Sequence, residues 1–206
     1  MLGALLLQYG YHVDNTTGVA TGNEPESIFA VMSGTHFNDG CCFDYGNSET
    51  NDRDDGPGAM EAIYFGNAHW RGNTGAGKTG PWVGADLESG MYYGGGENQT
   101  VNNTQNQALP FEFVTASVKG HRDGFAIKGG DATHGVLTTM YDGPRPKYAG
   151  YQPAKKQGAI ILATGGDNSN SAEGSFYEGF MAKGYTDDAT DAAVQRNIIA
   201  VGYRTL

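Results

Sequence analysis

Turn residues divide the sequence into short segments with the composition of β-strands. Eight such segments are rich in β-branched and aromatic residues and are bounded by Gly, Asn, Asp or Pro. They span residues 27–34, 60–66, 81–94, 109–120, 124–130, 135–143, 158–166 and 174–184. The chain has 33 glycines among 206 residues, and this excess favours tight turns between strands over long amphipathic helices. The pattern therefore predicts an antiparallel β-fold.

Only one segment has a helical pattern. The stretch 187–201 has acidic residues in its first turn and aligns Val194, Ile198 and Val201 on one face. The stretch 94–107 is rich in Asn and Gln, and we expect a long exposed loop there. No linker divides the chain, so we expect a single domain over 1–206. The predicted fold is all-β, an antiparallel β-sandwich of the jelly-roll or concanavalin-like kind with one short helix near the carboxyl terminus.

The chain is acidic, with a net charge of −10. It has no Lys/Arg cluster that could neutralise phosphates, which argues against nucleic acid and anionic membranes as partners. A neutral carbohydrate is compatible with this charge. No run approaches the roughly 18 apolar residues that a membrane-spanning helix needs.

The stretch "GNTGAGKTG" contains the spelling of a phosphate-binding P-loop, from Gly72 to Thr79. A P-loop works because its glycine-rich turn leads into the amino end of a helix, whose N–H groups hold the phosphates. Here Gly80 and Pro81 follow at once, and strand-like residues come next. We therefore predict a glycine-rich loop that binds no nucleotide, with Lys78 in solvent.

Carboxylates are the main candidates for chemistry. Asp86 and Glu88 lie two residues apart, so a strand would place both on one face. Asp167 follows an apolar strand in a glycine-flanked turn, and Glu61 lies in another strand. Glycoside hydrolysis needs two carboxylates that converge on a sugar. The histidines are scattered and do not predict a zinc site; they are His12, His36, His69, His121 and His134.

The only two cysteines, Cys41 and Cys42, are adjacent. Adjacent Cα atoms are about 3.8 Å apart across a trans peptide, less than the usual spacing across a disulfide, so a bond between them would close a strained ring. Such a ring would offer a rigid apolar plate to a ligand. Two neighbouring reduced thiols are the alternative, and the residues alone leave both open.

Several stretches resemble the catalytic domain of the family 54 α-L-arabinofuranosidases. They are "TGNEPESIFAVMSGTHFNDGCCFDYGNSET", "MEAIYFGN", "GPWVGADLE", "KQGAIILATGGDNSN" and "GSFYEGFM", in the family's order and with similar spacing. The resemblance runs from about Tyr9 to the end and includes the rare Cys-Cys pair. It implies a β-sandwich and a retaining enzyme that releases terminal arabinofuranose from arabinan and arabinoxylan. It implies no cofactor and no metal.

The resemblance also implies roles for individual residues. The family's nucleophile falls on Glu88, and its general acid/base falls on Asp167. Its vicinal disulfide in the sugar pocket falls on the Cys41–Cys42 pair. Further substrate-binding positions fall on Trp70, Asp86, Ser89 and Gly166, and Glu61 would have a supporting or structural role.

The retaining mechanism sets conditions on these two carboxyls. Their separation is expected to be about 5–5.5 Å. The pKa of Asp167 should be raised by burial or by the charge of Glu88, whereas Glu88 should stay ionised.

The chain also departs from the family pattern. Ser89 stands where the family has Asn, so one hydrogen bond to substrate is expected to differ. The chain lacks much of the family's amino-terminal portion and its arabinose-binding trefoil, which suggests self-association or a partner chain that covers strand edges. The rival hypothesis is a non-catalytic β-sandwich for carbohydrate binding or structural assembly.

The resemblance implies an extracellular, secreted protein. Sequons at Asn15, Asn98 and Asn102 suit secretion. The first ten residues lack a basic region and a cleavage site, so we expect that a signal was removed or that the chain starts inside a longer protein.

Overall fold

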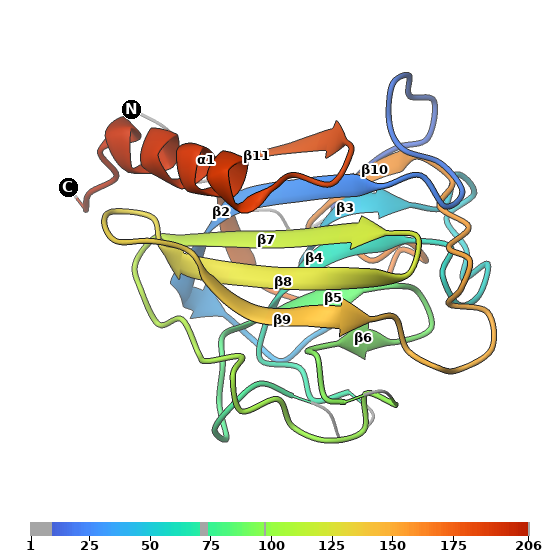
Figure 1. Cartoon of the computed structure of the whole chain (residues 1–206), viewed down its shortest axis with the longest axis horizontal. Helices are drawn as coiled ribbons and strands as arrows, with labels where there is room; N and C mark the ends of the chain where they lie inside the picture. The colour runs from blue at the N-terminus through green and yellow to red at the C-terminus, as the bar shows by residue number, and fades with distance from the viewer. Residues whose placement is uncertain (1–9, 71–73, 97, 206) are drawn as a thin grey trace.

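The computed structural model describes residues 10–70, 74–96 and 98–205, which form two antiparallel sheets packed face to face (Figure 1). One sheet has six strands in the order β1-β10-β3-β4-β5-β6, and the other has five in the order β11-β2-β7-β8-β9. The six-stranded sheet contains β1 (Tyr11–Val13), β3 (Asp44–Ser48), β4 (Glu61–Gly66), β5 (Trp82–Asp86), β6 (Met91–Tyr92) and β10 (Ala159–Leu162). The five-stranded sheet contains β2 (Glu26–Phe37), β7 (Val114–His121), β8 (Gly124–Asp131), β9 (Thr138–Pro144) and β11 (Gly174–Lys183). The predicted β-sandwich is confirmed.

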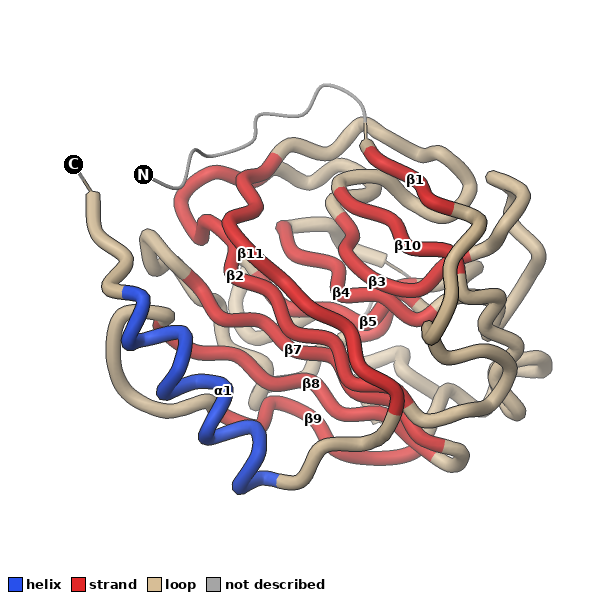
Figure 2. Tube along the Cα trace, turned by 90° about the horizontal axis from the view of Figure 1, so that it is seen from above, coloured by secondary structure: helices blue, strands red, loops and turns tan. Residues whose placement is uncertain are grey.

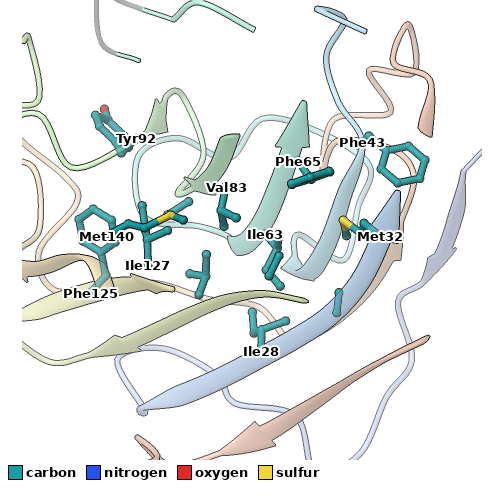
Figure 3. Close-up of a cluster of buried hydrophobic side chains, with 14 of the residues drawn as sticks. Ile28, Met32, Phe43, Ile63, Phe65, Val83, Tyr92, Phe125, Ile127 and Met140 are labelled. Atoms are coloured by element: carbon teal, nitrogen blue, oxygen red, sulfur yellow. The ribbon is translucent and has the colours of Figure 1, made fainter. Parts of the chain in front are cut away.

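Alternating apolar side chains of both sheets meet in the main core (Figure 3). Phe125 and Ile127 of β8 point into it, and Ala126 between them does not belong to this cluster. Ile63 of β4 faces them from the other sheet. Burying each large apolar side chain contributes about 1.5–3 kcal/mol, so this layer is the main stabilising feature of the sandwich.

The predicted helix is α1 (Asp188–Val201), which lies along the outer face of the five-stranded sheet (Figure 2). Asp187 caps it by accepting a 2.7 Å hydrogen bond from the Thr190 N–H. Ile198 packs with Val31 and Phe113 of the sheet region. Val201, expected on the same buried stripe, is 46% exposed instead, because it lies at the end of the helix beyond these contacts.

A buried ion cluster explains Glu61. Its carboxylate forms an ion pair with Arg145 and lies 3.5 Å from Lys156 Nζ. A Cβ at Gly120 would overlap this carboxylate, so the glycine makes room for it. Burial would raise the pKa of Glu61, but the charges of Arg145 and Lys156 outweigh burial and hold that pKa below its usual range. Glu61 is therefore a structural residue, the second of the two roles considered for it.

Some elements differ from the prediction. β1 and β3 were not predicted, and strand β7 begins only at Val114. The predicted strand 81–94 is broken by a turn into β5 and β6. The loop 94–107 is mostly exposed in its described part, but Asn106 is buried and donates a 2.8 Å hydrogen bond to the Val83 carbonyl. Among the described residues, no helix is both long and apolar enough to cross a membrane.

Candidate active site

A pocket of about 110 Å³ opens on the outer face of the six-stranded sheet. Asp86 lies on that face, because it pairs with Ala62 while its neighbour Ala85 points into the core. Gly46 of β3 pairs with Ala62 on the side opposite Asp86. A Cβ at Gly46 would overlap Ala62. All eight site residues expected from the sequence line the pocket, namely Cys41, Cys42, Trp70, Asp86, Glu88, Ser89, Gly166 and Asp167. The strands and loops thus gather segments that are far apart in the chain.

Glu88 reaches the pocket from the turn between β5 and β6. It is 6% exposed and has a φ of 64°, and Ser89 has a φ of 51°. Non-glycine residues rarely adopt this left-handed conformation, and it is concentrated at functional sites. The turn is held by a 3.0 Å hydrogen bond from the Glu88 N–H to Asp86 Oδ1. Asp86 and Glu88 therefore face the same pocket, but the predicted strand alternation is wrong, since Glu88 lies beyond the strand.

Asp167 lies in the loop that follows β10. This loop is closed by a 2.8 Å hydrogen bond from the Gly165 N–H to the Ser169 carbonyl, and Asp167 Oδ1 accepts from the Ser169 N–H at 2.9 Å. Asp167 lines the pocket but is exposed. The burial expected for an acid at this position is therefore not provided by the chain alone.

The two cysteines form a disulfide across a cis peptide bond, with Cα atoms 2.9 Å apart. Of the two alternatives, the disulfide is the one observed. Cys42 packs in an apolar cluster with Tyr64 and Trp82, and its Sγ lies 3.8 Å from Asp86 Oδ2. The sulfurs and Asp86 are close enough to share a metal ion, but a disulfide has no thiolate to bind one. Trp70, 38% exposed, adds an aromatic surface to the pocket.

Asp44 is a buried carboxyl that the sequence reasoning did not single out. It is fully buried in β3, and within the described residues neither of its oxygens has a conventional donor. It faces Asp86, and two carboxyls can hydrogen-bond only if one carries a proton. Burial and the charge of Asp86 raise the pKa of Asp44 well above its usual range, while burial raises the pKa of Asp86 to about 7. Asp44 is therefore the protonated partner.

Glu49 is a second carboxyl that was missed, and it faces Glu88. Burial, the hydrogen bond with Glu49 and the charge of Asp86 raise the pKa of Glu88 to about 10. These effects favour the protonated form of Glu88, so the expected ionisation of Glu88 depends on where the proton shared with Glu49 lies. Both missed carboxyls lie in or beside β3, whose polar sequence "DYGNSE" looks like a turn. Only the burial of this strand between β10 and β4 identifies them.

The described part of the P-loop spelling has a different structure. Gly72 lies outside the described residues, and residues 74–80 form a loop that leads into β5, not into a helix. Lys78 is exposed, as predicted. Within the described residues, no candidate metal-binding group contains a histidine.

A family model, curated relatives and solved structures at 47–52% identity all identify one family. Residues 4–204 match the family model described as "Alpha-L-arabinofuranosidase B, catalytic". A probable α-L-arabinofuranosidase B of Aspergillus fumigatus is 52% identical over 197 residues, which cover 95% of this chain and 38% of that relative. The chain therefore spans well under half the length of this curated relative.

Two solved structures are also similar. One is a glutamate-to-glutamine mutant of a family 54 α-L-arabinofuranosidase soaked with 4-nitrophenyl α-L-arabinofuranoside, with a TM-score of 0.93, 47% identity and coverage of 98% of this chain and 42% of that chain. The other is an arabinofuranosidase complexed with arabinofuranosyl-α-1,2-xylobiose, with a TM-score of 0.91, 48% identity and coverage of 97% and 41%.

Proposed function

The chain belongs to the α-L-arabinofuranosidase B catalytic-domain family, and on this premise we propose that it is a retaining glycoside hydrolase that releases terminal α-L-arabinofuranose. The observation that carries the proposal is the pocket, in which Glu88 and Asp167 lie together with the disulfide and Trp70. Two carboxyls beside apolar and aromatic surface provide both the chemistry and the binding face that a sugar requires.

The proposed reaction has two steps. Asp167 donates its proton to the oxygen of the leaving group as the bond to the anomeric carbon breaks, and Glu88 forms a new bond to that carbon. Asp167, now ionised, takes a proton from water, whose oxygen attacks the same carbon and releases Glu88. The leaving group that occupies the pocket mouth would supply the burial that exposed Asp167 lacks.

The remaining pocket residues bind and orient the sugar. Asp86 accepts hydrogen bonds from hydroxyls, and the disulfide and Trp70 offer apolar faces. Gly166 allows close approach of the backbone beside the acid. Ser89 Oγ donates a 3.1 Å hydrogen bond to Asp54, another residue that lines the pocket, so this side of the pocket differs from a family site that has Asn.

The substrate is an arabinofuranose-containing polysaccharide. One solved relative was crystallised with an arabinofuranosyl xylobiose, which supports arabinoxylan, and we propose arabinan as the other source. Such polymers are outside the cell, so we propose an extracellular location. A non-catalytic carbohydrate-binding or structural role remains the competing proposal, and turnover distinguishes the two.

The test is hydrolysis of 4-nitrophenyl α-L-arabinofuranoside by the wild type and two variants. Glu88→Gln should lower kcat by roughly 10³-fold or more, because no nucleophile remains. Asp167→Asn should lose roughly 10²–10⁴-fold on arabinoxylan, and less on the nitrophenyl substrate, whose leaving group needs little protonation. Asp142→Asn, an exposed carboxylate of β9, is the matched control and should keep wild-type rates. A folded wild type without turnover would favour the non-catalytic role.

A further inference from the structure

We propose that Glu49 is a positioning residue that shares one proton with Glu88 and takes this proton as the sugar reacts, so that its carboxyl donates a hydrogen bond that keeps the Glu88 carboxylate oriented and ionised for attack. The proposal rests on the proposed hydrolase function of Glu88. Glu49 itself does not line the pocket, so it acts only through Glu88.

Gly166 brings the two carboxyls close together. A Cβ at this position would overlap Oε2 of Glu49, and it would lie 3.3 Å from Oε2 of Glu88. Both carboxyl groups thus lie against Gly166. Glu88 lines the pocket, whereas Glu49 lies farther from the pocket. Glu49 is 0% exposed, so its carboxyl has no access to solvent.

The described residues around Glu49 include no lysine or arginine that could neutralise its carboxylate. Within the described residues, no lysine or arginine pairs with it, and no side-chain donor other than a protonated carboxyl reaches its oxygens. His12 of β1 lies beside it but binds its main-chain carbonyl, at 2.8 Å. The other titratable neighbours, Asp55 and Asp86, are both acidic.

Two carboxyls in this position cannot both be ionised. Like charges at close range, removed from water, make the pair hold one proton tightly. Burial raises the pKa of both groups, but the hydrogen bond between them raises the pKa of Glu88 and lowers that of Glu49, so the proton rests on Glu88 while the pocket is empty. One shared proton makes one group a donor and the other an acceptor.

The shared proton explains how Glu88 can be a nucleophile. When the proton is on Glu49, Glu88 is a carboxylate that accepts a hydrogen bond from a group fixed by the fold. Positive charge that develops on the sugar ring in the transition state favours this arrangement. Glu88 then bonds to the anomeric carbon while the proton stays on Glu49, and the same proton is present when water releases the sugar. No proton enters or leaves the pair during the cycle.

Two substitutions of Glu49 separate positioning from folding. Glu49→Gln keeps a donor for Glu88, and it should retain kcat within roughly tenfold of the wild type. Glu49→Leu removes the donor at similar volume, and it should lower kcat by roughly 10²-fold with little change in KM, because Glu49 does not touch the sugar. Glu26→Gln, which changes another buried glutamate outside the pocket, is the matched control. Thermal unfolding checks that each variant is folded.

The pH profile provides a readout that a structural role would not change. The pair loses its first proton more easily than a lone buried carboxyl, since the remaining proton stabilises the single negative charge. The acid limb of kcat/KM should therefore move to higher pH in Glu49→Gln, by about one unit, and further in Glu49→Leu. Equal kcat losses in the two folded variants, or unshifted acid limbs, would overturn the proposal.

A second measurement is independent of turnover. Glutamate labelled with ¹³C at the carboxyl reports protonation by NMR. At about pH 9 Glu26 is ionised, because burial raises its pKa only to about 7. The wild type should therefore show one protonated glutamate, that of the Glu49–Glu88 pair. This signal should disappear in Glu49→Gln. A wild type without this signal would overturn the shared proton, whereas a wild type with the signal but no turnover would contradict only the hydrolase function.

Discussion

Burial of Asp86 controls the charge of this pocket residue, for which we propose a role in sugar binding. Its carboxyl is 8% exposed, and burial raises its pKa to about 7. Protonation below that pH would remove the charge-assisted hydrogen bonds that we propose between this carboxyl and sugar hydroxyls.

We therefore expect KM for the nitrophenyl arabinofuranoside to be several-fold higher at pH 5 than at pH 8. Asp86→Asn should raise KM and remove this difference, because the amide does not titrate. Steady-state kinetics at both pH values tests this. A pH-independent wild-type KM, or an unchanged slope in the variant, would contradict this role of Asp86.

The sequence predicted the residues that line the pocket, but not the carboxyls behind them. Glu88 and Asp167 lie in motifs that could be matched to a family. Asp44 lies in β3 and Glu49 directly follows it, and the polar residues of this strand look like a turn. Their roles depend on burial beside Asp86 and Glu88, and burial follows from the tertiary fold.

At the scale of the elements, buried charges join the two sheets. Arg145 follows β9 and is 2% exposed, and it pairs with Glu61 of β4 in the other sheet. A buried carboxylate that loses its partner is strongly destabilising, since its desolvation is no longer offset.

Arg145→Met should lower the free energy of unfolding by about 3–5 kcal/mol, measured by urea denaturation. Arg122→Met is the control, because the Arg122 side chain is 83% exposed, and it should change stability by less than about 0.5 kcal/mol. A loss below about 1 kcal/mol for Arg145→Met would contradict a structural role for this ion cluster.

The elements also show where sequence patterns fail. The helix was predicted because its cap and apolar stripe are local features. The break between β5 and β6 was missed because "DLESG" contains no proline and only one glycine. The left-handed conformation of Glu88 and Ser89, which no local preference predicts, makes this turn.

At the scale of the whole molecule, glycine content and turn spacing were sufficient to predict a sandwich. Strand order was not predictable, because pairing partners are distant in the sequence. Tyr11 of β1 pairs with Leu162 of β10, and Glu26 of β2 pairs with Gly120 of β7. The pocket depends on this order, since it brings the loop after β10 over the turn that carries Glu88.

We propose Glu88 as the nucleophile of a retaining arabinofuranosidase, and trapping the covalent intermediate tests this role directly. Asp167→Asn should slow release of the covalent intermediate when the leaving group is nitrophenolate, so the intermediate should accumulate. The variant is mixed with 4-nitrophenyl α-L-arabinofuranoside, quenched with acid, digested and analysed by mass spectrometry. We expect one arabinosyl group attached to Glu88. A label on another residue, or active enzyme that never carries a label, would contradict it.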